Sequence, residues 1–150
     1  MAIKNILWPT DLSETSFLAL PKVTEISGKF GAKVHLLYVA DDLSRHDHYY
    51  GDADPAMLKD LQKRECGWAE KALANVCDRE LAGCADFVKE VRKGEPVEAI
   101  LQRAAEDDVD LIIMASRGRD KKARAGVGHF GSVAERVMKN SPVPVMLVNP

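Results

Sequence analysis

The side chains and glycines best suited to bind a ligand lie in one stretch of the sequence, residues 114–133. An apolar run at 110–114, typical of a buried strand, precedes it, and a run at 132–139 with helical periodicity follows it. Glycines at 118, 126, 128 and 131 let backbone N–H groups turn toward a ligand, and arginines and lysines add positive charge. The helix start contributes the positive end of its dipole. This combination predicts an anion site, and phosphate is the anion that we expect.

Two other functions are less consistent with this stretch. Gly126, Gly128 and Gly131 form a GxGxxG pattern, but the dinucleotide motif follows its strand at once and needs an acidic residue about 20 positions later, which this sequence lacks. NAD is therefore not expected. The basic residues could clamp a triphosphate, bind nucleic acid or remain solvated; they are Arg117, Arg119, Lys121, Lys122 and Arg124. Because no aromatic residues lie among them, phosphate is favoured over nucleic acid.

Side chains that could bind a metal gather in the polar segment 41–55. His46 and His48 have acidic neighbours, but an HxH pair in an exposed loop lacks the preorganisation of a zinc site, so no metal site is predicted. The three cysteines, at 66, 77 and 84, have no CxxC spacing and are expected to be small buried hydrophobes. His35, within an apolar run, is expected to satisfy a hydrogen bond.

Length and composition limit the classes of protein to consider. With 150 residues, 46% of them hydrophobic, the chain can fill one core, so residues 1–150 are predicted to form a single domain. A net charge of −2 argues against a general nucleic-acid binder. No apolar run has the length of a signal peptide or a membrane span, so we expect a cytoplasmic protein that binds no membrane.

Apolar runs and helical patterns alternate along the whole chain. Strands are predicted at 3–9, 33–39, 87–92, 110–114 and 142–148, and helices from Ser13 to the glycines at 28 and 31, from Pro55 to Leu81, from Pro96 to Asp108 and over 132–140. Pro21 lies inside the first helix and should bend or shorten it. In the helix that follows Pro96, the residues expected to face inward are Val97, Ile100, Leu101, Ala104 and Ala105. Strands joined by such helices run parallel, with helices on both faces of an open sheet.

Ligands bind such sheets beyond the carboxyl ends of the strands. The candidates at the ends of the first, second and fourth strands are Pro9, Thr10, Asp11, Val39, Ala40, Met114 and Ala115. Pro142 and Pro144 cannot donate ladder hydrogen bonds, which places the last strand at a sheet edge and suggests dimerisation by edge pairing.

Over nearly its whole length the chain resembles the universal stress protein family. The resemblance rests on KNILWPTDLS at 4–13, VHLLYV at 34–39, GEP at 94–96, DLIIMASRG at 110–118, GSVAER at 131–136 and PVPVMLV at 142–148. It implies an α/β fold, a doubly wound open five-stranded parallel sheet ordered 3-2-1-4-5. It also implies a homodimer through the last strand, from Val143 to Val148, and places the chain near an ATP-binding branch.

That branch carries Gly, two residues, Gly, nine residues, then Gly with Ser or Thr. In this chain Ala115 replaces the first glycine, and twelve residues, Arg119 to Phe130, separate Gly118 from the final pair. We assign the final pair to Gly131 and Ser132, because residues 132–135 have the capping-box form with Ser132 as the N-cap.

The resemblance also assigns roles to residues. Pro9, Thr10, Asp11, Val39 and Ala40 would lie at the adenine and ribose, and Met114, Ala115 and Gly118 at the ribose and first phosphates. Gly131, Ser132 and Val133 would bind the outer phosphates with N–H groups and a hydroxyl, with Arg119 as a further candidate. The expected ligand is ATP, or AMP or ADP, and Mg²⁺ would accompany ATP, held mainly by phosphates and water.

The predicted function is therefore an adenine-nucleotide-binding stress or signalling protein. No nucleophile with an adjacent base is recognisable, so little or no catalytic turnover is expected. The alternative is a family member without nucleotide that acts through dimerisation, the 41–54 segment and protein partners as yet unknown.

Overall fold

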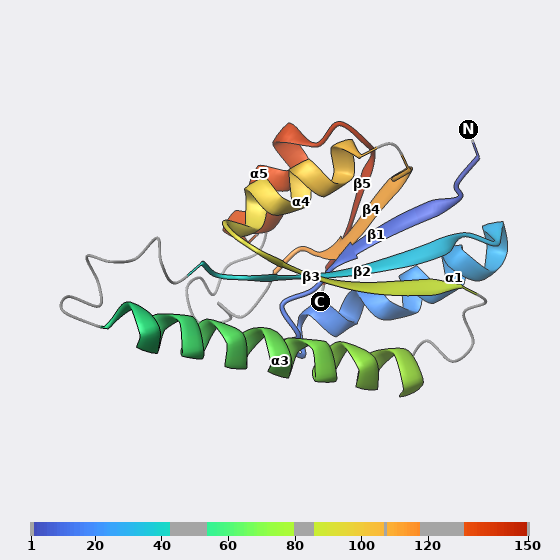
Figure 1. Cartoon of the computed structure of the whole chain (residues 1–150). Helices are drawn as coiled ribbons and strands as arrows, with labels where there is room; N and C mark the ends of the chain where they lie inside the picture. The colour runs from blue at the N-terminus through green and yellow to red at the C-terminus, as the bar shows by residue number, and fades with distance from the viewer. Residues whose placement is uncertain (1, 43–53, 80–85, 107, 118–130, 150) are drawn as a thin grey trace.

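Five parallel strands form one sheet in the order β3-β2-β1-β4-β5 (Figure 1). The computed structural model describes residues 2–42, 54–79, 86–106, 108–117 and 131–149. The strands are β1 (Asn5–Pro9), β2 (Lys33–Ala40), β3 (Phe87–Lys93), β4 (Leu111–Ala115) and β5 (Val145–Val148). The predicted fold and the predicted strand order are confirmed.

Helices cover both faces of the sheet (Figure 1). One face carries the short 3-10 helix η1 (Ser16–Ala19), α1 (Leu20–Phe30) and α3 (Pro55–Arg79); the other carries α4 (Pro96–Ala105) and α5 (Ser132–Asn140). Because strand side chains alternate, Ile6 and Trp8 join the core on the first face and Leu7 joins the core on the second. All three are fully buried, as expected for strands with both faces covered.

The first helical region differs from its prediction. The chain forms a 3-10 turn first, and α1 begins only at Leu20, which places Pro21 in the first turn of the helix. Proline is tolerated there because the first N–H groups of a helix have no intrahelical partner. Of the two expected effects of Pro21, the helix is therefore shortened and not bent. Ser13 still acts near the start of the region, since its hydroxyl accepts a hydrogen bond from the Ser16 N–H at 3.2 Å.

Other helix and strand boundaries differ from their predicted positions by a few residues. The strand β5 begins at Val145, after the two prolines, and it lies at a sheet edge as predicted. The predicted end of the long helix at Leu81 falls outside the described residues, as do residues 43–53 of the predicted polar loop. On α4, Val97, Ile100 and Ala104 are buried as predicted.

Two residues of α4 contradict the predicted helix face. Ala105 was expected to point inward and is exposed, whereas Arg103 is only 6% exposed. The buried face of α4 therefore includes Arg103 near the C-terminus of the helix, where this side chain contacts carboxylates.

Among the described residues, no helix combines the length and apolar composition that crossing a bilayer requires.

Candidate functional site

A cavity of about 310 Å³ opens at the carboxyl ends of β1, β2 and β4. Its volume is at the lower end of the range of small-molecule sites, roughly 300–1,000 Å³. The starts of α4 and α5 close its other side. Its lining consists of Pro9, Thr10, Asp11, Ser16, Val39, Pro96, Ile100, Met114, Ala115, Arg117, Gly131, Ser132, Val133 and Ala134.

Most of the residues predicted from the sequence meet around this cavity. Those that line it are Pro9, Thr10, Asp11, Val39, Met114, Ala115, Gly131, Ser132 and Val133. Ala40 does not line it, because its side chain lies in the core on the α1 and α3 side of the sheet. Gly118 and Arg119 lie outside the described residues. The contacts of all these residues with a ligand remain predictions.

The structure adds lining residues that were not predicted, chiefly Ser16, Pro96, Ile100 and Ala134. The position of Pro96 at the cavity could have been predicted from the sequence, because a helix that follows a parallel strand begins at the carboxyl edge of the sheet, where ligands bind. Arg117 also lines the cavity; it belongs to the basic run that was considered for phosphate binding.

The segment after β1 forms the first polar wall of the cavity. Asp11 lies in a tight turn in which its Oδ1 accepts hydrogen bonds from both the backbone N–H and the hydroxyl of Ser13. The next residue, Leu12, has a φ of 63°, a left-handed conformation that is uncommon for a residue with a β-carbon. The turn therefore fixes Asp11 and Thr10 beside the cavity at some cost in backbone strain.

The start of α5 forms the opposite wall. Gly131 is the N-cap, with its N–H donating to the Ser116 carbonyl at 2.7 Å and its own carbonyl accepting from the Glu135 N–H at 3.0 Å. Ser132 is thus the first helical residue and makes no capping hydrogen bond, so its predicted role as N-cap was wrong. The residues of the first turn of α5 line the cavity, and the N–H groups at the start of a helix bind anions well.

The start of α4 reaches the same cavity but is already capped. The Glu95 carboxylate accepts a hydrogen bond from the Glu98 N–H at 2.8 Å and one from Arg136 Nη1 at 3.3 Å. An external anion at the start of α4 would meet the Glu95 carboxylate. The N-cap of α5 is Gly131, which forms no side-chain cap hydrogen bond. Of the two helix starts, α5 is therefore the one suited to an external phosphate.

The two walls can bind a ligand that differs at its two ends. Asp11, Thr10 and Ser16 suit hydrogen-bond donors such as hydroxyl or amino groups, while α5 and Arg117 suit an anion. Among the described residues, no group of three acidic, histidine or cysteine side chains could hold a metal ion. The His46–His48 segment lies outside the described residues.

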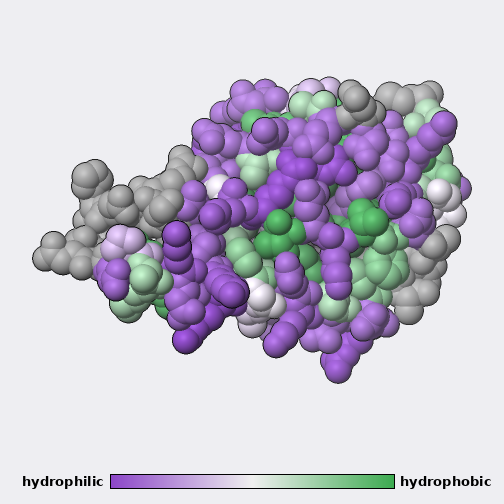
Figure 2. Space-filling view, viewed as in Figure 1, coloured by the Kyte–Doolittle hydropathy of each residue, from purple (hydrophilic) through white to green (hydrophobic). Residues whose placement is uncertain are grey.

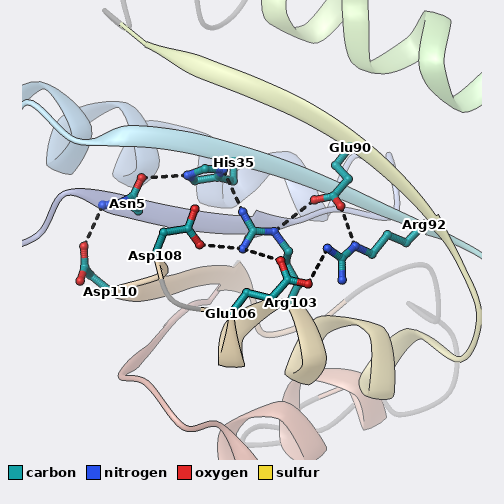
Figure 3. A network of polar contacts seen from close by, with 8 residues as sticks. All are labelled: Asn5, His35, Glu90, Arg92, Arg103, Glu106, Asp108 and Asp110. Carbon is teal, nitrogen blue, oxygen red and sulfur yellow. Dashed lines mark hydrogen bonds and ion pairs between the residues drawn. The ribbon is translucent and has the colours of Figure 1, made fainter.

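A second polar cluster lies away from the cavity, near the amino ends of β1 and β4 (Figure 3). His35 Nε2 is 2.9 Å from Asn5 Oδ1, and His35 Nδ1 is 3.1 Å from Arg103 Nη2, which confirms that His35 satisfies hydrogen bonds. Arg103 also donates to Glu90 at 3.1 Å and to Asp108 at 3.0 Å. Burial, with the charge of Arg103, lowers the pKa of His35, and the hydrogen bond from Arg103 lowers the pKa of Asp108.

Comparisons with known proteins agree with this architecture. The model of the universal stress protein family matches residues 2–149. Two proteins of Methanocaldococcus jannaschii are each 31% identical to the chain: universal stress protein MJ0531, over 97% of this chain and 81% of its own length, and universal stress protein MJ0577, over 97% and 94%. The solved structure of MJ0577 covers 100% of this chain and 98% of its own, with 29% identity and a TM-score of 0.82.

Two further solved structures share the fold and contain nucleotides. One is a universal stress protein in complex with cAMP, 20% identical with a TM-score of 0.70, covering 99% of this chain and 98% of its own. The other is the Archaeoglobus fulgidus universal stress protein in complex with dAMP, 19% identical with a TM-score of 0.59, covering 98% of each chain.

Proposed function

This chain belongs to the universal stress protein family, and from that premise we propose that it is an adenine-nucleotide-binding stress-response or signalling protein. The single observation that carries the proposal is the cavity between the turn after β1 and the uncapped start of α5. The N–H groups of α5 would bind phosphate, and the Asp11 side would bind the base or ribose. Nucleotides in the cAMP and dAMP complexes of two relatives support the ligand class.

The proposal is for a single domain that binds nucleotide with little or no turnover. Among the described residues that line the cavity, Asp11 is the group that could act as a base, and its Oδ1 already accepts two hydrogen bonds from Ser13. ATP is the first candidate, with ADP and AMP beside it, and Mg²⁺ would accompany ATP. A cytoplasmic location remains a prediction from the sequence.

Calorimetry with ATP, ADP and AMP tests the proposal. We expect binding in the micromolar range, about −8 kcal/mol, and adenine nucleotide among the small molecules released by denaturing fresh protein. Neither heat nor a thermal shift with any of the three would refute it and favour the alternative, a family member that acts through protein partners.

Two substitutions at Ser132 isolate the contribution of the helix start. Gly131, with φ −62° and ψ 152°, already has the conformation that a residue before proline adopts, and proline is accepted at the first position of a helix. Ser132→Pro therefore removes one N–H and the hydroxyl with the helix intact, while Ser132→Ala removes only the hydroxyl.

We expect Ser132→Pro to weaken ATP binding by about tenfold or more relative to Ser132→Ala, since a hydrogen bond to a charged group contributes about 1.5–3 kcal/mol. Isothermal titration, with circular dichroism to verify the fold, measures the difference. Equal affinities of the two variants would show that this N–H does not contact the phosphates.

We also propose a homodimer that pairs through β5. The two edges of the sheet differ in charge: β3 (FVKEVRK) carries four charged side chains, while β5 (VMLV) carries none. Charged side chains protect an edge against pairing with another chain, which leaves β5 as the edge suited to it.

A further inference from the structure

Hydrogen bonds within residues 10–16, the segment after β1, form a directed chain. The Leu12 N–H donates to Thr10 Oγ1 at 3.0 Å, Thr10 Oγ1 lies 2.8 Å from Ser16 Oγ, and Ser16 Oγ donates to the Ser13 carbonyl at 2.8 Å. Thr10 and Ser16 are only 6% and 5% exposed. Both line the cavity.

The chemistry of the two ends fixes the direction of the middle contact. A carbonyl oxygen only accepts, so the single hydroxyl proton of Ser16 points to Ser13. In the contact with Thr10, the Ser16 oxygen must then accept, and Thr10 must donate. The Ser13 hydroxyl likewise donates to Asp11 Oδ1. The hydroxyl protons of Thr10, Ser13 and Ser16 are all donated within the segment.

We infer that the side chains of this wall that line the cavity, those of Thr10, Asp11 and Ser16, offer only hydrogen-bond acceptors to a ligand, and that Ser16 is the positioning residue that makes Thr10 one of them. Thr10, Asp11 and Ser16 line the cavity, and none of their side-chain oxygens has a proton left for the ligand. The wall therefore selects N–H and O–H donors, such as the amino group of a base or the hydroxyls of a ribose, over carbonyl or phosphate oxygens. This inference rests on the proposed nucleotide function.

The inference predicts discrimination between closely related ligands. A ligand that lacks the required donor leaves a buried acceptor unpaired, and sites of this kind reject such analogues strongly. In Ser16→Ala, the Thr10 hydroxyl proton loses its partner and can turn toward the ligand. Thr10 then accepts or donates as needed, so the variant should tolerate analogues that the wild type rejects.

Calorimetry with ATP and three analogues tests this. Inosine triphosphate lacks the amino group of adenine, and 2′-deoxy-ATP and 3′-deoxy-ATP each lack one hydroxyl. We expect at least one analogue to bind wild type tenfold or more weakly than ATP, and the same analogue to bind Ser16→Ala within about threefold of ATP. Ratios within threefold for all three analogues on wild type, or a ratio unchanged by Ser16→Ala, would overturn the inference.

Matched variants separate positioning from a loss of stability. Ser27 is also buried, and its hydroxyl donates to the Ala32 carbonyl at 2.7 Å near the far end of α1. Ser27→Ala should lose a comparable hydrogen bond yet keep the wild-type ratios, and Ser16→Thr, which retains the hydroxyl, should keep them too. If Ser16→Ala does not fold, Thr10→Val removes the acceptor directly and should abolish the same discrimination.

The experiment distinguishes a failure of the proposed function from a failure of this inference alone. If ATP, ADP and AMP all give neither heat nor a thermal shift with wild type, the proposed function and this inference both fail. If ATP binds but the analogue ratios contradict the expectation, only the acceptor wall is refuted.

Discussion

The imidazole of His35 lies between Asn5 and Arg103, and these two partners determine its protonation (Figure 3). Arg103 has only N–H donors, so His35 Nδ1 must accept and Nε2 carries the proton toward Asn5. A second proton on Nδ1 would face the guanidinium. Charged groups near His35 are Arg103 on α4, Asp108 after it, Lys33 on β2 and Glu90 on β3, and the net effect of burial and these charges is to lower its pKa.

The direction of this shift determines how His35 affects stability. Because its pKa is lower in the folded protein than its ordinary value near 6.5, the unfolded chain takes up a proton first as the pH falls. The stability that neutral His35 contributes is therefore complete above about pH 6.5 and declines as the pH falls toward its folded-state pKa.

The variant His35→Gln tests this dependence. Glutamine can accept and donate but does not titrate, so between about pH 6.5 and 5 its free energy of unfolding should fall less steeply than that of wild type. One proton limits this difference to at most about 1.4 kcal/mol per pH unit. Urea unfolding at several pH values measures it, and identical slopes would contradict the assignment.

Asp108→Asn provides the control for that experiment. The pKa of Asp108 is lowered by its hydrogen bond from Arg103, so the stability it contributes is present above about pH 4 and lost only below. This variant should be less stable than wild type at pH 7, and its slope between pH 6.5 and 5 should be at least as steep as that of wild type, because removing the Asp108 charge lowers the pKa of His35 further.

Only part of this cluster could be predicted from the sequence. His35 was correctly expected to satisfy a hydrogen bond, because a histidine within an apolar strand must find partners. The burial of Arg103 was missed, because arginine is mostly exposed unless paired and the carboxylates that pair it come from β3 and from the chain after α4. Only the tertiary structure brings those groups together.

At the scale of the element, α1 contains one glycine within the helix and has another at its end. Gly28 is helical, and a β-carbon there would meet nothing within 4 Å, whereas Gly31 is the C-cap with a φ of 63°. The same substitution should therefore have opposite effects at the two positions. Alanine favours the helix over glycine, but it is strained in the left-handed conformation.

We expect Gly28→Ala to raise the free energy of unfolding by about 0.5–1 kcal/mol and Gly31→Ala to lower it by about 1 kcal/mol. Chemical denaturation of both variants beside wild type measures the two signs. Two changes of the same sign would show that α1 does not end at Gly31.

The starts of helices were harder to predict than their existence. The capping-box pattern at 132–135 indicated a helix correctly but placed its N-cap one residue late. The difference arises because the Gly131 N–H is held by the Ser116 carbonyl, a contact from the end of β4 that local sequence does not contain. Similarly, Pro21 marked a break correctly, but whether it bends a helix or begins one depends on the 3-10 turn before it.

At the scale of the whole molecule, the alternation of apolar strands and helices was sufficient to predict a parallel sheet with both faces covered. The carboxyl-edge rule then brought residues from three strands to one cavity. It could not predict Ser16 or Ile100, because their positions depend on the packing of η1 and α4 against the sheet. The strand order came from the family resemblance, since periodicity alone does not specify which strands are neighbours.

The two edges of the sheet provide the last prediction. The side of the molecule on which α3 and the edge strand β3 lie is largely hydrophilic, with apolar residues in small separate patches (Figure 2). This is expected for a protected sheet edge. On the other edge β5 has no charged residue. Met146 on β5 and Val88 on β3 are 36% and 39% exposed, so a lysine at either position should cost the monomer fold little and by a similar amount.

If the protein dimerises through β5, Met146→Lys should raise the dimer dissociation constant by tenfold or more, because two symmetry-related lysines would meet near the paired strands. Val88→Lys adds the same charge at the opposite edge and should leave the constant unchanged. Sedimentation equilibrium over a concentration series measures all three proteins. A monomeric wild type, or a larger effect of Val88→Lys than of Met146→Lys, would exclude β5 as the dimer interface.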